Sequence, residues 1–326
     1  MNQETQNINQ EKVVAGIDVG KAHLDVHIEP TGEMRQFPND AGGRRGLRTM
    51  LHKAGIELVV VEATGRYHRA LHQSLHACGL PVAVVSPLRA RRFAQAAGQM
   101  AKTDPLDASL LAWLGQVMGP EVTEPLGEEQ LQLADLCRAR AKLAVDKAAY
   151  LNASREYEAS EAVAVTAHMI EQFEQQIARL EDAIRTLIAN NPEFARRARI
   201  LQSIKGFGAV TAAVLCAEIP ELGTVDRHAA AALAGLAPYP DDSGKRKGQR
   251  YIKGGRMLPR NTLYMAATSA IKFNPDMKSF YDRLIGEGKA HKVALTAVMR
   301  KLVILANVLV RDDRNWTAIA PEPSVG

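Results

Sequence analysis

Hydrophobic residues in roughly the first 120 positions form short runs whose spacing alternates between that of strands and that of helices. Continuous or alternating apolar runs predict strands, and a period near 3.6 predicts helices. The expected strands are Val13–Val19, His23–Glu29, Glu33–Pro38, Leu58–Ala63 and Val82–Ser86. The expected helices are Gly42–Ala54, Tyr67–Cys78, Pro87–Ala97 and Asp104–Met118.

The order of these elements predicts one α/β arrangement. Three strands joined by short turns favour an antiparallel meander, and two later strands that follow helices favour parallel additions to the same sheet. This is the element order of an RNase H-like fold. We therefore expect an α/β domain over residues 12–125, preceded by a polar leader, residues 1–11, that we expect to be disordered.

Helical periodicity continues through most of the remaining chain. From Glu128 to about Arg199, apolar residues recur at helical spacing among many charges, which is typical of a long helical pair or coiled coil. We expect residues 126–195 to be a helical coiled-coil linker, although helices packed onto one of the domains fit equally well. Residues 196–326 are expected to form a mostly α domain, interrupted by a polar, glycine-rich stretch from Pro238 to Gly255.

Charge is distributed unevenly along the chain, whose net charge is +5. Residues 1–195 carry 20 Lys and Arg against 25 Asp and Glu, whereas residues 196–326 carry 21 against 11. A basic C-terminal portion suggests a polyanionic partner, with a solvated surface as the equal alternative. The three isolated cysteines indicate neither a disulfide framework nor a zinc site and fit a reducing cytosol, and no run of about 18 apolar residues predicts a membrane span.

Four acidic residues fall at the ends of predicted elements. Asp18 ends the first strand, Glu62 lies at the end of the fourth, and Asp104 and Asp107 open the last helix on one face. In an RNase H-like sheet the first and fourth strands are neighbours and the final helix packs across their ends, so these carboxylates should converge. Converging carboxylates repel one another and need cations, and their oxygen atoms suit Mg²⁺ or Mn²⁺. Two such ions can bind the attacking and leaving oxygens of a phosphodiester. Each acid taken alone is also compatible with a surface position or a helix cap.

Other motifs in this half have competing interpretations. The segment Gly16–Lys21 also resembles the phosphate-binding hairpin of actin-like kinases, but no second copy of that domain follows. Three histidines share a helix face, where a solvated or phosphate-facing stripe is favoured over a metal site; they are His68, His72 and His76. Three arginines after the fifth strand either touch nucleic acid or face solvent; they are Arg89, Arg91 and Arg92.

The C-terminal part contains two candidate nucleic-acid elements. Gly206 and Gly208 permit a tight hairpin between two helices, and the second helix start could bind phosphate in a helix-hairpin-helix; an ordinary helical corner is the equal alternative. The second element runs from Lys245 to Arg260 with seven Lys and Arg and no acid. Its candidate contacts are Lys245, Arg246, Lys247, Arg250, Lys253 and Arg256. On chemistry alone, Ser243 at its head could be a nucleophile, but an ordinary turn is favoured.

Six motifs, taken together, resemble those of the DEDD insertion-sequence transposases, a family that includes the pilin-gene invertase and the bridge-RNA-guided recombinases. They occur in order over nearly the whole chain. The motifs are Gly16-Ile-Asp18-Val, Val61-Glu62-Ala-Thr-Gly65, Lys102-Thr-Asp104-Pro-Leu-Asp107-Ala, Gly235-Leu-Ala-Pro238 through Ser243-Gly-Lys245, Lys253-Gly-Gly-Arg256 and Arg260-Asn-Thr-Leu-Tyr264-Met-Ala-Ala.

The resemblance implies that Asp18, Glu62, Asp104 and Asp107 hold Mg²⁺ in a RuvC-like domain. It also implies that Ser243 attacks DNA and forms a 5′-phosphoserine intermediate. The implied partners are DNA at the element ends and at the target, a noncoding guide RNA, and further copies of the chain in a dimer or tetramer, in a bacterial-type cytosol.

Two alternative functions and one hypothesis about assembly accompany this interpretation. A Holliday-junction-type hydrolytic nuclease would use the same carboxylates with water as the nucleophile, leaving Ser243 as a bystander. A nucleic-acid-binding scaffold would carry a catalytically dead site. If the helical segment acts as an arm, the serine of one copy and the carboxylates of another could form a composite site.

Overall fold

The computed structural model describes residues 12–63, 65–98, 104–239 and 251–318, and of residues 104–106 and 239 only the backbone. The chain forms two compact units that divide between Leu126 and Gly127. We call them the N-terminal unit and the C-terminal unit, and each is described by itself.

The N-terminal unit is built on a five-stranded sheet in the order β3-β2-β1-β4-β5. β1, β2 and β3 form an antiparallel meander, and β4 and β5 extend the sheet in parallel from β1. The strands are β1 Val14–Val19, β2 His23–Glu29, β3 Glu33–Pro38, β4 Leu58–Glu62 and β5 Val82–Val85. The predicted mixed sheet, with its meander and two parallel additions, is confirmed.

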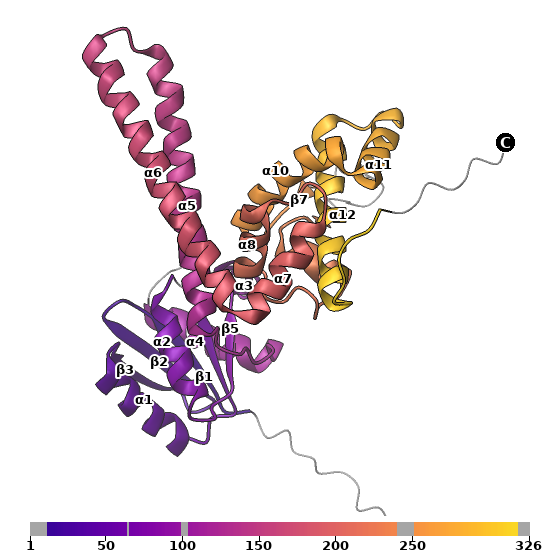
Figure 1. Ribbon diagram of the computed structural model, residues 1–326. Coiled ribbons are helices and arrows are strands. Elements are labelled where there is room, and N and C mark those ends of the chain that lie inside the picture. Colours follow the sequence, from indigo (N-terminus) through magenta and orange to yellow (C-terminus); the bar gives the residue numbers. More distant parts are fainter. Residues whose placement is uncertain (1–11, 64, 99–103, 240–250, 319–326) are drawn as a thin grey trace, which may run out of the picture. The chain divides into compact units, whose positions relative to one another are not determined.

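Helices cover both faces of this sheet, which Figure 1 shows in indigo and purple. They are α1 Ala41–Lys53, α2 Tyr67–His76, α3 Pro87–Ala96 and α4 Asp104–Met118. On one face, alternate strand residues such as Ile17 and Val61 pack with Leu47 of α1 and Leu71 of α2. On the other face, their neighbours pack against α3 and α4. The side-chain alternation of the strands therefore serves two cores, which explains their nearly continuous hydrophobicity.

Local capping fixes where the helices begin. The Asp40 side chain accepts a hydrogen bond from Gly43 N at 2.7 Å and starts α1. Ser86 accepts one from Arg89 N at 3.3 Å and starts α3, with Pro87 in the first turn. Both residue types satisfy N–H groups that have no partner within the helix.

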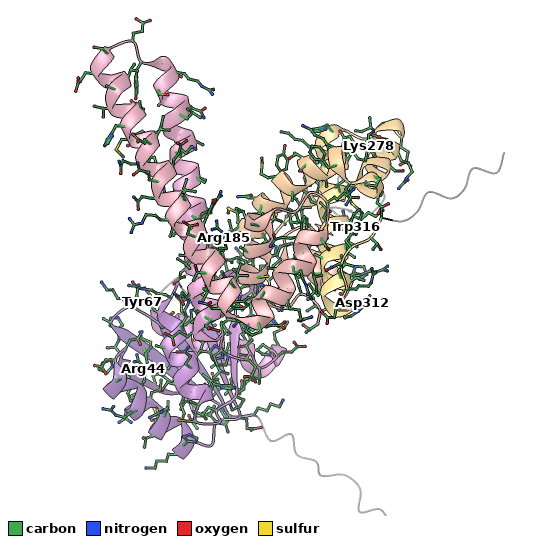
Figure 2. All side chains as sticks on the ribbon, in the orientation of Figure 1. Arg44, Tyr67, Arg185, Lys278, Asp312 and Trp316 are labelled. Atoms are coloured by element: carbon green, nitrogen blue, oxygen red, sulfur yellow. The ribbon has the colours of Figure 1, made fainter. Side chains whose placement is uncertain are left out.

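The C-terminal unit begins with two long helices, α5 Glu128–Ala153 and α6 Ser160–Asn190, joined through the short 3₁₀ helix η1 Ser154–Glu156. They run antiparallel and side by side (Figure 1). Ion pairs between them show this direction, since they link Lys147 to Glu174 and Arg140 to Glu181, both at 2.8 Å. On their surface, Arg185, labelled in Figure 2, pairs with its own helix neighbour Asp182, and apolar side chains such as Val145 and Val165 are also exposed.

The base of this pair is part of a larger helical core. Leu133 and Cys137 of α5 and Ile184 of α6 belong to the main hydrophobic cluster of the unit. This packing favours the interpretation of helices that are seated on one domain, and the separate linker stays a prediction.

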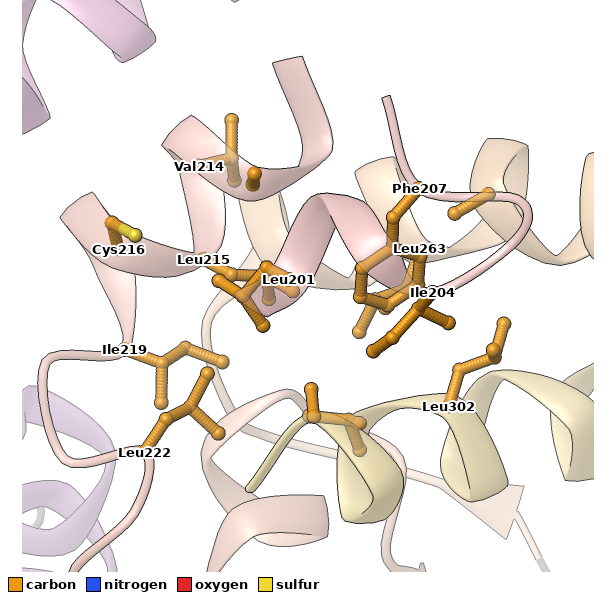
Figure 3. Close-up of a cluster of buried hydrophobic side chains, with 14 of the residues drawn as sticks. Leu201, Ile204, Phe207, Val214, Leu215, Cys216, Ile219, Leu222, Leu263 and Leu302 are labelled. Carbon is orange, nitrogen blue, oxygen red and sulfur yellow. The ribbon is translucent and has the colours of Figure 1, made fainter. Parts of the chain in front are cut away.

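The remaining helices and one short hairpin complete the unit. They are α7 Pro192–Ser203, α8 Ala209–Glu218, α9 Arg227–Leu233, β6 Pro238–Tyr239, β7 Tyr251–Ile252, α10 Met257–Phe273, α11 Pro275–Gly286 and α12 His291–Arg311. Leu201, Ile204, Leu215, Leu263 and Leu302 meet in their core (Figure 3), and all five are fully buried. The expected mostly helical character of this part is observed.

Helix α12 is long and apolar enough to pass a length-and-composition test for a membrane span. Its apolar side is buried in the core just described, through residues such as Leu302 and Val303. Buried Asn307 on the same helix accepts a hydrogen bond from Gly223 N and donates one to Val225 O, both at 2.8 Å. We therefore interpret α12 as the central helix of a folded domain.

Candidate carboxylate site and nucleic-acid interface

The end of the sheet brings two of the predicted acids side by side. In the parallel pairing of β1 and β4, Ile17 is the partner of Val61, so the next residues along, Asp18 and Glu62, are adjacent at the strand ends. Neighbouring strands lie about 4.8 Å apart. Both carboxylates are partly exposed, and Glu62 is the last residue of its strand.

These two acids are on the face of the sheet that α4 covers. A Cβ added to Gly16 would lie 2.1 Å from Ala108 O of α4, so Gly16 faces that helix. Side chains alternate between faces along a strand, so Asp18, two residues further on, shares this face. The same holds for Glu62, because Val60 packs in the cluster beneath α4.

The contacts of α4 also fix its direction. Ala108 lies over Gly16, whereas Gly115, two turns later, lies against Val14, two residues earlier in β1. Helix α4 therefore runs antiparallel to β1, and its first turn lies toward the strand ends. That turn begins at Asp104.

The first turn of α4 contributes the remaining two predicted acids. Asp107 is partly buried, whereas the side chain of Asp104 lies outside the described residues. Among the side chains that the structure describes, no three acids, histidines or cysteines are gathered closely enough to hold a metal ion. Among the described side chains, Asp18, Glu62 and Asp107 thus share one face and one end of the sheet without surrounding a single point. Like charges so arranged repel, and a cation would draw them together.

Four carboxylates are nevertheless a suitable donor set for a hard divalent cation. Their oxygen atoms are the ligands that Mg²⁺ and Mn²⁺ prefer. Asp18 and Glu62 are on strands of the sheet, and Asp107 is on α4, whose position on the sheet is set by the close contacts of Gly16 and Gly115. The roles of Asp18, Glu62, Asp104 and Asp107 as ligands stay predictions.

Two members of the histidine stripe on α2 make contacts within the N-terminal unit, and the expectation of a solvated or phosphate-facing stripe is wrong for His72. His72 is buried, and its Nε2 hydrogen-bonds Thr123 O at 2.7 Å. Burial lowers the pKa of His72 below its ordinary value. His76 pairs with Glu124 at 2.7 Å. These side chains hold the segment that follows α4 against α2. The sequence did not indicate this, because helical spacing shows which residues share a face but not what that face contacts.

Three arginines lie on the exposed surface of α3, as the sequence pattern allows; they are Arg89, Arg91 and Arg92. Both interpretations of them, contact with nucleic acid and exposure to solvent, stay open.

In the C-terminal unit, Gly206 and Gly208 separate α7 from α8. Gly206 has a φ of +107°, and a Cβ there would lie 2.7 Å from the Cβ of Ala270 in α10. The nearby Asn274 donates a hydrogen bond to Lys205 O at 3.2 Å. Gly206 is therefore required by a close approach of α10, whereas Gly208, which caps α8, has open space around it. Phosphate binding by either glycine stays a prediction.

The basic segment is only partly described. Ser243 and four of the predicted contacts lie outside the described residues; these contacts are Lys245, Arg246, Lys247 and Arg250. The residues that flank the undescribed part form the short hairpin of β6 and β7, in which Pro238 pairs with Ile252 and Tyr239 with Tyr251. Lys253 is exposed on the C-terminal side of this hairpin.

Arg256 is occupied within the fold. Its guanidinium forms a two-point ion pair with Glu221 and also donates a hydrogen bond to Glu218 O. The adjacent Gly255 approaches Gly235 so closely that an added Cβ would lie 2.1 Å from Gly235 N. Arg256 thus holds the base of the hairpin, and its contact with nucleic acid stays a prediction.

Two family models match the chain. One, described as a transposase of the IS110 DEDD type, matches residues 15–157, and the other, described as the transposase IS116/IS110/IS902 family, matches residues 198–282. The boundaries place the acids in the first matched region and Ser243 in the second.

Two relatives match nearly the whole chain, and a third matches part of it. The pilin gene-inverting proteins of Moraxella bovis and Moraxella lacunata are 28% and 29% identical over 320 residues, which cover 93% of this chain and 97% of each relative. An uncharacterized 44.8 kDa protein of insertion element IS116 from Streptomyces clavuligerus is 30% identical over 206 residues, 61% of this chain and 49% of that protein.

Among solved structures, T. thermophilus RuvC in complex with a Holliday junction substrate is similar at 18% identity and a TM-score of 0.27, covering 35% of this chain and 99% of RuvC. That likeness is slight, and the fold assignment depends on the strand order instead. On the two family matches and the full-length relatives, the chain belongs to the IS110/IS116/IS902 family of insertion-sequence transposases.

Proposed function

We propose that this transposase cuts and rejoins DNA strands without net hydrolysis. In this proposal Asp18, Glu62, Asp104 and Asp107 hold Mg²⁺ or Mn²⁺, and Ser243 is the nucleophile. The observation that carries it is the antiparallel seating of α4 on β1, which directs the first turn of α4 toward the strand ends of Asp18 and Glu62.

In this proposal the carboxylates supply a negatively charged site at one end of the sheet. When bound there, a divalent cation would polarise a phosphodiester and stabilise the negative charge that develops during transfer. Ligands on strand ends and on a packed helix are held more precisely than ligands on loops, which favours catalysis. The sheet and α4 therefore act as the scaffold, and the acids orient the reacting phosphate.

The serine step balances without water. Oγ of Ser243 loses its proton and bonds to phosphorus, while the bond from phosphorus to the 3′ oxygen breaks and that oxygen takes up a proton. The products are a 5′-phosphoserine and a free 3′ hydroxyl. Attack by a 3′ hydroxyl on the phosphoserine then reseals DNA and releases the serine, so the phosphodiester bond is conserved.

Several features support nucleic-acid partners. The excess of 21 Lys and Arg over 11 Asp and Glu in residues 196–326 suits a polyanion. The Moraxella relatives are named for inverting a gene, which is a rearrangement of DNA. We propose DNA at the element ends and target as the substrate, a noncoding RNA as the guide, a dimer or tetramer as the working form, and the cytoplasm as its location.

The test is strand cleavage by the full chain in Mg²⁺. Asp18→Asn and Asp104→Asn should each abolish cleavage while leaving nucleic-acid binding nearly unchanged, because each removes a ligand charge without altering size. Glu33→Gln, at an exposed position of β3, is the matched control and should cleave normally.

The possible outcomes separate the alternatives. Near wild-type cleavage by both Asp variants would contradict the carboxylate site. Metal-dependent cleavage that leaves no DNA on the protein would indicate a hydrolytic junction nuclease. Absence of cleavage by the wild-type chain with its element ends and RNA in Mg²⁺ or Mn²⁺ would indicate a binding scaffold.

A further inference from the structure

A fifth acid lies at the level of the carboxylate site. In the antiparallel register of β1 and β2, Asp25 is the direct partner of Asp18. Two residues beyond Asp18, Gly20 N donates a hydrogen bond to His23 O at 2.9 Å, so Gly20 and His23 are a hydrogen-bonded pair of the ladder. Such pairs alternate along an antiparallel ladder, so Asp18 and Asp25 form another, with Cα atoms about 5.5 Å apart and side chains on the same face.

The register extends this row across the sheet. Gln36 of β3 is the partner of Asp25, and its Nε2 donates a hydrogen bond to Asp25 Oδ1 at 2.8 Å. On the other side of Asp18, Glu62 occupies the neighbouring position of β4. The order across four strands is therefore Gln36, Asp25, Asp18, Glu62 at one level.

Asp25 also faces the start of α4. It lines a groove of about 210 Å³ together with Val26, Met34, Arg35, Gln36 and Ala108. Ala108 directly follows Asp107 in the chain, so the wall of this groove is the first turn of α4. Asp25 thus lies close to both Asp18 and the helix start that carries Asp107.

The position is unfavourable for an acid on its own. Like charges directly opposite each other on neighbouring strands destabilise a sheet. The hydrogen bond from Gln36 orients Asp25 without neutralising it. Arg35 lines the same groove, but in the part of the chain that the structure describes no Lys or Arg forms an ion pair with Asp25. A positive charge near Asp18 would convert this repulsion into an attraction.

We propose that Asp25 is a positioning residue for the divalent cation of this site, which it engages through a cation-bound water molecule. The inference rests on the proposed function, in which Asp18 binds the cation directly. Gln36 fixes Oδ1 of Asp25, and Oδ2 accepts a hydrogen bond from the water. Because β2 and β4 flank β1, Asp25 and Glu62 lie on opposite sides of Asp18, and the calorimetric titration below distinguishes a water-mediated contact of Asp25 from direct binding.

Groups in this role have measurable effects on the metal. Outer partners of metal ligands typically change metal affinity or activity by about 10- to 100-fold. For a single water-mediated contact from a partly exposed carboxylate, we expect the lower end of that range. Asp25→Asn keeps the size and the bond to Gln36 through its side-chain oxygen, and it removes the charge.

The first experiment titrates Mn²⁺ into the full chain by calorimetry. Asp25→Asn should raise the Mn²⁺ dissociation constant about 10-fold. Asp18→Asn should abolish binding at the site, and Glu29→Gln, on the same strand and face but bonded to His27, should bind as wild type does. Without metal, Asp25→Asn should melt at or above the wild-type temperature, because a repulsion is removed.

The second experiment measures DNA cleavage as a function of Mg²⁺. Asp25→Asn should shift the half-saturating Mg²⁺ concentration about 10-fold upward, with the rate at saturation within about twofold of wild type. A purely structural role for Asp25 would lower the saturated rate instead. Gln36→Ala should shift the curve in the same direction and add little to Asp25→Asn, because it acts through that carboxylate.

The outcomes distinguish this inference from the proposed function. If Asp18→Asn loses Mn²⁺ but Asp25→Asn binds it as wild type does, the role of Asp25 is wrong and the carboxylate site stands. If Asp25→Asn binds no Mn²⁺ at any concentration, Asp25 is a direct ligand, which contradicts the water-mediated contact. If Asp18→Asn itself binds Mn²⁺ normally, the proposed function fails.

Discussion

The contact between β1 and α4 should not tolerate a side chain at Gly16. A Cβ there would lie 2.1 Å from Ala108 O and 2.3 Å from Ala112 N, which are backbone atoms of α4. Ordinary contact begins near 3.4 Å, so in Gly16→Ala the helix must withdraw from the strand by about 1 Å. No rotation of a side chain can relieve this clash.

The magnitude follows from that geometry. Overpacking a core costs about 1–3 kcal/mol, and a clash with backbone belongs at the upper end, about 3 kcal/mol. In a domain of this size each kcal/mol lowers the melting temperature by roughly 3–5 °C, so we expect a fall of about 10–15 °C. Because α4 carries Asp104 and Asp107, a shift of about 1 Å should also lower cleavage about 100-fold in protein that remains folded.

The assay combines thermal unfolding with cleavage measured well below the melting point of the variant. Gly46→Ala is the control, since Gly46 is an exposed residue within α1 whose added Cβ would only touch the Phe37 ring at 3.4 Å. Alanine favours a helix there, so its stability should change by less than about 1 kcal/mol, toward stabilisation. A Gly16→Ala protein that melts within about 2 °C of wild type and cleaves normally would refute the seating of α4 on β1.

Further predictions concern charge, RNA, pH and assembly. Nucleic-acid binding should weaken with salt, log K falling by about 0.7–0.9 per phosphate neutralised for each log unit, and replacing Lys245, Arg246 and Lys247 with Ala should flatten the slope; an unchanged slope means that these residues do not touch the backbone. Purified protein should retain a discrete noncoding RNA, and normal recombination by RNA-free protein would exclude a guide. The lowered pKa of His72 means that the unfolded chain takes up a proton more readily, so stability should fall as pH drops below about 6.5 by at most about 1.4 kcal/mol per pH unit; His72→Gln should reduce that loss in melting curves at pH 7.5 and 5.5, and equal losses would assign it elsewhere. Asp18→Ala and Ser243→Ala proteins, each inactive alone, should regain some cleavage when co-assembled, whereas a mixture as inactive as its parts, with mixed oligomers confirmed, would place both roles in one chain.

Much of the N-terminal unit could be predicted from the sequence because its strands have strong local signals. The alternation in His23–Glu29 and the valine-rich run before Glu62 predicted strands at the observed positions. The level at which α4 meets β1 could not be predicted, because it depends on Gly16 meeting Ala108 and on Gly115 meeting Val14, each across about 100 residues of chain. That level decides whether Asp107 lies near Asp18.

Contacts between distant parts of the chain are what local patterns leave out. The helix face of His72 was correctly grouped, but its partner is Thr123, which lies 51 residues away and has no sequence signal. Arg256 lies in a run of basic residues typical of nucleic-acid contact, and its ion pair with Glu221 has no sequence signal, while the contact itself stays a prediction. Asp25 was missed for a different reason, because only the β1–β2 register shows that it is opposite Asp18. The alternation of buried Leu24 and Val26 was the available clue to its face.

The central claim is that a serine and a carboxylate-held cation together transfer DNA strands. The most direct measurement is to incubate the full chain with its element ends, RNA and Mg²⁺, then denature it and map any DNA that stays covalently bound. The account predicts a 5′-phosphate linked to Ser243, absent from Ser243→Ala and from Asp18→Asn. Metal-dependent cleavage by the Ser243→Ala protein at the wild-type rate, with no adduct in either protein, would contradict it.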